Sequence, residues 1–149
     1  FEEYVAKLLK RGLAGSLFSV STQGGKKACL FEGDQGRFGT RPDILIRHQD
    51  KVVMVIDTKW KRISSRIEDA KHGINQGDVY QMMAYSQLYE CDRVMLLYPY
   101  HQGLSGSLPQ QTYAIGTAGA SRKLLISTID VSRRHSTVTA SLSKLVMKK

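Results

Sequence analysis

The clearest pattern in this chain of 149 residues is the alternation of short apolar segments with polar, glycine-containing connections. The run Val52–Ile56 is continuously apolar and rich in β-branched residues, which is typical of a central strand buried on both faces. At the N-terminus, apolar residues recur every three or four positions, which predicts an amphipathic helix over residues 1–10 that ends at Gly12 and Gly15. The apolar face of this helix would hold Phe1, Tyr4, Val5, Leu8 and Leu9.

The rest of the chain divides into further short elements. Residues 17–31 are predicted to form a hairpin of two strands around Gln23–Lys26, followed by a loop over residues 33–39. Asp78 is a good N-cap for a helix that runs to about Glu90, after a surface loop over residues 60–77. Further strands are predicted at residues 43–46, 93–98, 111–115 and 123–129, and the tail from residue 132 onward fits either a short helix or a strand. This order of elements predicts one α/β domain over residues 1–149, with a mixed central sheet flanked by helices.

Two acidic residues lie at the edges of neighbouring predicted strands. Asp43 opens one strand and Asp57 ends the next, and a turn over residues 48–51 makes the two strands antiparallel. Both carboxylates are therefore expected at the same end of the sheet. Lys59 follows Asp57 by two positions and projects from the same face of the strand, because side chains alternate with a period of two.

Such a set of groups suits the hydrolysis of phosphodiesters. Carboxylates hold Mg²⁺, a hard cation that takes oxygen ligands, and the cation neutralises phosphate charge and acidifies water. Lys59 would orient or deprotonate the attacking water and stabilise the developing charge. The plain alternative is that Asp43 and Asp57 cap turns, a common place for aspartate, and that Lys59 belongs to a solvated charged edge.

These residues also resemble a known signature. Pro42-Asp43 followed by Asp57-Thr58-Lys59 resembles the motif of the PD-(D/E)xK nucleases, and Gln81 with Tyr85 resembles the QxxxY element of their RecB-like branch. Over about residues 1 to 100 the chain is most similar to the nuclease subunit of McrBC-type restriction systems. The resemblance implies a restriction-endonuclease-like fold. It also implies a catalytic set and a metal-binding set, the first being Asp43, Asp57, Lys59, Gln81 and Tyr85, and the second Asp43, Asp57 and the backbone carbonyl of Thr58.

The same resemblance implies DNA as the substrate and Mg²⁺ as the cofactor, which Mn²⁺ can replace. It further implies a GTP-hydrolysing AAA+ partner, McrB, which reads methylated cytosine, and a homodimer or higher assembly. The family's N-terminal region that contacts the GTPase has no counterpart here and the chain opens without Met, so we expect a piece of a longer subunit. Two alternatives stay open: a stand-alone RecB-like or Holliday-junction-type nuclease, and a non-catalytic module that binds DNA or a partner.

The first predicted helix offers a third acid. At about 100° per residue, Glu2 falls beside Val5 and Leu9 at the edge of the apolar face, whereas Glu3 points nearly the opposite way. Glu2 is therefore the candidate third metal ligand. The competing interpretation is a solvated carboxylate that the helix dipole stabilises.

The charge of the chain favours a polyanionic partner. It carries 22 Lys plus Arg against 13 Asp plus Glu, a formal net charge of +9. Lys61, Arg62 and Arg66 are candidate contacts to DNA phosphates, with plain solvent exposure as the alternative. No apolar run approaches the ~20 residues that cross a bilayer and no leader is visible, so we expect a cytoplasmic protein of a bacterium or archaeon.

Other reactive residue types show no site pattern. Cys29 and Cys91 lack the CxxC spacing of a zinc site or redox pair, which favours two reduced thiols. The four histidines lack metal-ligand spacing and are expected at the surface: His48, His72, His101 and His135. Met82 and Met83 are expected to pack in the core.

Overall fold

The computed structural model describes residues 1–64, 71, 73–104 and 110–148. Its centre is a mixed six-stranded sheet with the order β1-β4-β5-β6-β8-β7. The strands are β1 (Phe18–Thr22), β4 (Ile44–His48), β5 (Lys51–Thr58), β6 (Arg93–Pro99), β7 (Gln110–Ala114) and β8 (Lys123–Ile129). Strands β5, β6 and β8 are parallel to one another, while β1 with β4, β4 with β5, and β7 with β8 are antiparallel. The predicted mixed α/β architecture is confirmed.

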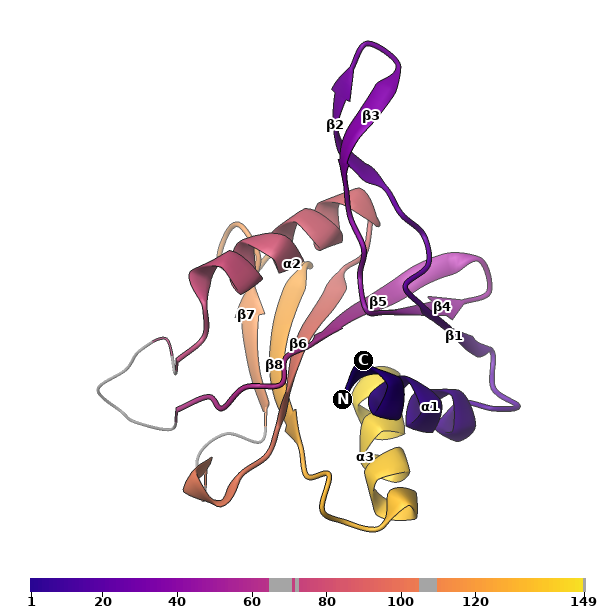
Figure 1. Cartoon of the computed structure of the whole chain (residues 1–149), viewed down its shortest axis with the longest axis vertical. Coiled ribbons are helices and arrows are strands. Elements are labelled where there is room, and N and C mark those ends of the chain that lie inside the picture. The colour runs from indigo at the N-terminus through magenta and orange to yellow at the C-terminus, as the bar shows by residue number, and fades with distance from the viewer. Residues whose placement is uncertain (65–70, 72, 105–109, 149) are drawn as a thin grey trace.

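Helices cover both faces of this sheet. Helix α2 (Gln76–Leu88) lies on one face, and α1 (Glu2–Gly12) and α3 (His135–Met147) lie together on the other, as Figure 1 shows. A short 3-10 helix, η1 (Gln102–Leu104), follows β6. The tail, whose sequence fits either a helix or a strand, forms the helix α3, which packs against α1.

Strand β5 alternates between the two layers. Met54 and Ile56 are buried with the side chains of α1 and α3, whereas Val55 is buried with those of α2. The prediction of a strand buried on both faces is therefore confirmed. Because side chains alternate with a period of two, Asp57 falls on the face of Val55, beneath α2.

The predicted hairpin over residues 17–31 is wrong in its pairing. Strand β1 pairs with β4, and β2 (Ala28–Glu32) pairs with β3 (Gln35–Gly39), a stretch expected to be a loop. Gly33, at φ 59°, supplies the tight turn between β2 and β3, while β1 extends the main sheet beside the apolar β4. The β2–β3 hairpin projects away from the rest of the molecule in Figure 1, and its residues are exposed apart from Ala28.

Helix α2 begins earlier than predicted. Its N-cap is Asn75, whose side-chain oxygen accepts hydrogen bonds from the backbone N–H groups of Gly77 and Asp78. Asp78 instead lies in the first turn, so the prediction that Asp78 caps the helix is wrong. Met82 is fully buried as expected, but Met83 is 40% exposed, because its side chain lines an open pocket between α2 and the strands β7 and β8.

The cysteines and the histidines differ in how far they are buried. Both cysteines are free thiols, Cys29 exposed and Cys91 buried. His135 is exposed as expected, whereas the rings of His48 and His101 are half-buried; His72 lies outside the described residues. The predicted loop over residues 60–77 is only partly described and gives way to α2 at Gln76. No helix in the described ranges is long and apolar enough to cross a membrane.

Candidate functional site

The two predicted acids lie at one end of the β4–β5 pair. Ile44 of β4 pairs with Ile56 of β5, which places Asp43, just before β4, beside Asp57 near the end of β5. Leu45 and Val55 are buried on the α2 side of the sheet. Asp43 lies two residues before Leu45 and Asp57 two residues after Val55, so both aspartates project from that same side. The strand register thus gathers both carboxylates beneath α2. Asp43 is half-buried, and Asp57 is only 3% exposed.

Lys59 joins the two layers at this point. Its ammonium Nζ lies 2.6 Å from Oδ2 of Asp57 and 3.3 Å from Oδ1 of Asp78 on α2. It also donates a hydrogen bond to Oε1 of Gln81 at 3.3 Å. The main chain of Lys59 is fixed as well, because its N–H donates to the carbonyl of Leu97 on β6. The side chain therefore sits between strand and helix with oxygen atoms on both sides.

Asp43 is held by Thr58. The backbone N–H and the hydroxyl Oγ1 of Thr58 both donate to Oδ2 of Asp43, each at 2.8 Å. Charge-assisted hydrogen bonds of this kind fix the plane of a carboxylate. Both hydrogen bonds from Thr58 end on Oδ2 of Asp43, so Oδ1 of the same carboxylate receives neither of them.

Gln81 and Tyr85 complete the helix side of the site. They are four residues apart and so lie on one face of α2, and Nε2 of Gln81 donates to the Tyr85 hydroxyl at 3.0 Å. Tyr85 is buried, and its ring packs edge-on against Tyr89. A chain of polar contacts thus runs from Asp57 through Lys59 and Gln81 to Tyr85.

The site is electrostatically tuned by burial and by its own charges. Burial raises the pKa of Asp57; the Lys59 ammonium opposes this rise and the Asp43 carboxylate adds to it. Burial acts to lower the pKa of Lys59, but Asp57 and Asp78 outweigh it and the pKa is raised. Burial, followed by the charge of Asp57, raises the pKa of Tyr85 to about 12. At neutral pH Lys59 is an ammonium and Tyr85 a neutral hydroxyl, so Lys59 acts as a charge and a donor.

Sequence reasoning missed Asp78 as part of this cluster. Its Oδ1 contacts Lys59 and its Oδ2 contacts Lys61 at 2.5 Å. These two neighbours lower the pKa of Asp78 even though burial acts to raise it. Asp78 lies three residues before Gln81, so the helical spacing that joined Gln81 with Tyr85 could also have placed Asp78 on the same face.

Glu2 is not brought to the two aspartates by any contact in the described structure. Its Oε1 accepts a hydrogen bond from Gln23, whose own side-chain oxygen accepts one from Arg41. Helix α1 belongs to the layer opposite α2, although Phe1 at its start contacts the ring of Trp60. Glu3 is exposed. The role of Glu2 as a metal ligand stays a prediction.

The three candidate DNA-contacting residues differ in their surroundings. Lys61 is exposed but forms an ion pair with Asp78. Arg62 is exposed, and Arg66 lies outside the described residues. Trp60, which precedes Lys61, is exposed as well. The charged site is therefore followed in the chain by three exposed side chains, one aromatic and two cationic.

The donor set fits a hard divalent cation. Oδ2 of Asp57 is buried and accepts no well-directed hydrogen bond from the described residues, its 2.6 Å contact with Lys59 being ionic. No group of three or more His, Cys, Asp or Glu side chains in the described ranges could hold a metal. A cation here would therefore rely on Asp43 and Asp57, with other oxygens such as the Thr58 carbonyl, phosphate or water filling its shell.

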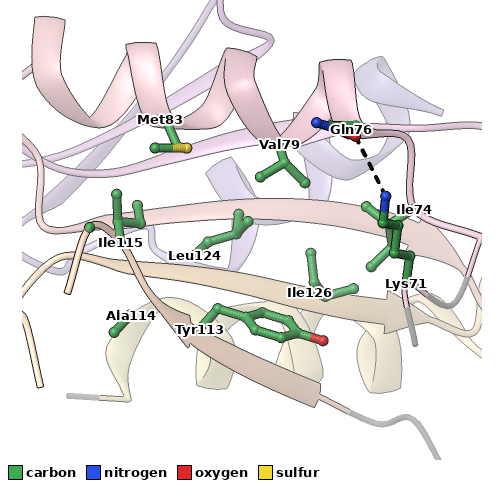
Figure 2. Close-up of a pocket in the computed structure, with 11 residues that line it drawn as sticks. Lys71, Ile74, Gln76, Val79, Met83, Tyr113, Ala114, Ile115, Leu124 and Ile126 are labelled. Atoms are coloured by element: carbon green, nitrogen blue, oxygen red, sulfur yellow. Dashed lines mark hydrogen bonds between the residues drawn. The ribbon is translucent and has the colours of Figure 1, made fainter. Parts of the chain in front are cut away.

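An apolar pocket of about 390 Å³ lies elsewhere, between α2 and the strands β7 and β8 (Figure 2). Val79 and Met83 extend from α2 toward Leu124 and Ile126 on β8. A hydrogen bond from Lys71 to Gln76 lies at one end of it. Among the residues that the structure describes, those lining the pocket include no carboxylate and none of the residues of the charged site.

Fold and site together define a class of α/β domain, in which a mixed sheet gathers two carboxylates and a lysine at the end of a central strand. A family model narrows this class. The McrBC 5-methylcytosine restriction system component family matches residues 1–99, and the chain belongs to that family.

A solved structure has the same fold. It is a chain from the refined half-complex of a tetradecameric assembly of Thermococcus gammatolerans McrB AAA+ hexamers with bound McrC. The TM-score is 0.67 at 13% sequence identity, over 98% of this chain and 32% of that chain. The present chain thus spans only about a third of the protein it matches. A comparison with curated proteins finds no match.

Proposed function

We propose that this chain is the Mg²⁺-dependent DNA-cleaving part of a McrBC-type restriction system, a PD-(D/E)xK endonuclease of the RecB-like branch. One observation carries the proposal. Asp43 and Asp57 meet beneath α2 with the ammonium of Lys59 at 2.6 Å from Asp57 and with Gln81 and Tyr85 behind it. Membership in the restriction-system family supports the same activity.

The residues divide the work of phosphodiester hydrolysis. A bound Mg²⁺ would neutralise charge on the phosphate and lower the pKa of water. Asp43 and Asp57 would hold the cation, with Thr58 fixing the carboxylate plane of Asp43 and offering its own carbonyl. Lys59 would orient the attacking water and stabilise the charge that develops on the phosphate. Gln81 would hold Lys59 in place through its side-chain oxygen, and the Tyr85 hydroxyl would in turn fix the amide of Gln81.

Substrate and partner are part of the proposal. The net charge of +9 favours a polyanion such as DNA. The structural neighbour comes from an assembly of McrB AAA+ hexamers with bound McrC, so we infer that this chain works with a McrB-like AAA+ GTPase in a higher assembly.

The decisive test is cleavage of a methylated plasmid beside an unmethylated one, with Mg²⁺ and with or without the GTPase partner and GTP. We expect cleavage of the methylated plasmid that requires partner, GTP and Mg²⁺ together, and none by an Asp57→Ala variant. Cleavage that needs no partner would instead favour a stand-alone RecB-like or Holliday-junction-type nuclease. DNA binding without cleavage under all conditions would favour the non-catalytic module.

A further inference from the structure

The carboxylate of Asp78 has both oxygens engaged by lysines of the strand end. Oδ1 lies 3.3 Å from the ammonium of Lys59, and Oδ2 lies 2.5 Å from that of Lys61. The side chain of Asp78 is only 16% exposed, so solvent screens these contacts less than at an open surface. A first-turn acid is common because it stabilises the helix dipole, but that role does not require contacts with two lysines of another element.

Lys59 is therefore shared between two carboxylates from opposite sides. Asp57 approaches from β5 at 2.6 Å and Asp78 from α2 at 3.3 Å, while Gln81 adds a neutral oxygen. Oδ2 of Asp57 is buried without a directed hydrogen bond from the described residues, and under the proposed function Asp57 would hold the divalent cation. A cation bound to Asp57 would compete with the ammonium for the same oxygen and repel it. An ammonium tied to Asp57 alone would then lose its position when the cation binds.

We propose that Asp78 is a positioning residue for Lys59, which keeps the ammonium beside the reacting phosphate when Asp57 is taken up by a divalent cation. Lys61 holds the second oxygen of Asp78 and so fixes the rotation of the carboxylate. The consequence for cleavage rests on the proposed nuclease function. The anchoring itself is a property of the chain and can be measured without any reaction.

The first test measures the order of the Lys59 side chain by NMR. The two Hε protons of Lys59, assigned by their absence in Lys59→Ala, give separate signals while the side chain is held and merge when it rotates freely. Asp57→Asn removes the charge of the competing anchor, as occupation by a cation would. We expect separate signals in the wild type and in Asp57→Asn, and merged signals in Asp57→Asn/Asp78→Asn.

The matched control is Asp57→Asn/Asp92→Asn, which changes charge equally but at the opposite end of the parallel strands, where Asp92 is exposed just before β6. This control should keep separate signals. Merged signals in Asp57→Asn alone, or separate signals in the double variant that lacks Asp78, would overturn the proposal. Neither outcome depends on whether the chain cuts DNA.

The second test is a double-mutant cycle on cleavage by the chain with its partner. Asp78→Asn should slow single-turnover cleavage by roughly 10- to 100-fold, the scale expected for a misplaced group. DNA affinity in Ca²⁺ should change less than threefold, and Asp78→Glu should restore part of the rate. In a Lys59→Ala background, Asp78→Asn should have almost no further effect. An equal loss in both backgrounds would mean that Asp78 has a merely structural role, whereas a wild type that never cuts would count against the proposed function alone.

Discussion

At the scale of single residues, polar contacts of the site converge on Lys59. Its ammonium has oxygen atoms of Asp57, Asp78 and Gln81 within 3.3 Å. A charged group held in this way loses little entropy when substrate arrives, because its position is already set. The raised pKa of Lys59 keeps that charge in place at neutral pH. Its contribution should therefore fall on the chemical step rather than on DNA binding.

Replacing Lys59 separates these two effects. One ammonium among 22 basic residues adds about 1 kcal/mol or less to DNA affinity when partly exposed. Loss of a group that assists the attacking water costs about 10²–10⁴ in rate. Lys59→Ala should therefore bind DNA within a few-fold of the wild type and cut it hundreds of times more slowly. The measurement is single-turnover cleavage in Mg²⁺ beside equilibrium binding in Ca²⁺.

Lys59→Arg is the matched variant, since it preserves the charge. It should rescue little, because the planar guanidinium cannot occupy the compact space between Asp57 and Gln81 in the same way. Parallel loss of binding and cleavage in Lys59→Ala would support the non-catalytic DNA-binding module. A wild-type rate would remove Lys59 from the mechanism.

The two thiols should differ sharply in reactivity. Cys29 lies on the exposed β2 strand, whereas Cys91 is fully buried and donates to the carbonyl of Arg93. Burial raises the pKa of the Cys91 thiol, which disfavours the reactive thiolate. Iodoacetamide at mild alkaline pH should modify the native chain once, at Cys29, and the denatured chain twice, as counted by mass spectrometry. Native Cys29→Ser should take up no label; labelling of that variant would mean that Cys91 is accessible.

At the scale of elements, Gly12 governs how α1 meets α3. A Cβ at Gly12 would lie 2.3 Å from Oγ of Ser143 and 2.7 Å from Cγ2 of Thr139, both on α3. Side chains do not approach this closely without displacement. The last residue of α1 is glycine because the two helices touch there.

Gly12→Ala should consequently destabilise the protein. Alanine normally stabilises a helix relative to glycine by up to about 1 kcal/mol, but overpacking costs about 1–3 kcal/mol. We expect a net loss of about 1–2 kcal/mol in the free energy of unfolding, measured by urea titration. Gly39→Ala is the control, because a Cβ at Gly39 meets nothing within 4 Å. Equal stability of the wild type and Gly12→Ala would show that α3 shifts freely on α1.

Elements marked by local periodicity were predictable. The apolar run of β5, the amphipathic face of α1 and the strand β8 are each encoded within a few consecutive residues. The meeting of Asp43, Asp57 and Lys59 also followed from local rules, since β4 and β5 are joined by a short turn and side chains alternate. Gln81 and Tyr85 required only the helical repeat.

Features that depend on distant partners were not predictable. Strand β1 pairs with β4 across more than twenty intervening residues, and the local sequence of Phe18–Thr22 does not indicate which strand it pairs with. The β2–β3 hairpin is rich in glycines, which are more typical of a loop. The sequence favours Asp78 as a helix cap, because aspartate is common at that position. In the structure Asn75, three positions earlier, caps the helix. The contact of Asp78 with Lys59 joins two elements that are far apart in the sequence, so no local pattern predicts it.

At the scale of the whole molecule, positive charge extends from the site onto the adjoining surface. Lys61 and Arg62, which follow the end of β5, are both exposed. The charge of Lys61 is partly neutralised by its ion pair with Asp78. If these side chains contact DNA phosphates, Lys61→Ala/Arg62→Ala should weaken DNA binding. The slope of log affinity against log salt should flatten by about 0.9 for each phosphate that the variant no longer neutralises, as measured by anisotropy titrations across salt concentrations.

A charge-matched variant separates this local effect from the loss of net charge. Lys7 and Lys10 are exposed on α1, in the opposite layer, and Lys7→Ala/Lys10→Ala removes the same charge. That variant should leave the slope near the wild-type value. The same change of slope in both variants would show that Lys61 and Arg62 make no specific phosphate contacts and are simply exposed to solvent.

The contact between α1 and α3 also bears on how the chain is made. The first helix is translated before any strand, but the apolar side chains that cover it, such as Leu142 and Val146, leave the ribosome after all the strands. Until α3 emerges, the face of α1 that carries Val5 and Leu9 can pack on the strands but lacks the part of its native cover that α3 supplies. The layer opposite α2 can close only after residues 135–147 have emerged, so the nascent chain is open to aggregation or chaperone binding on that side until translation of this region is complete.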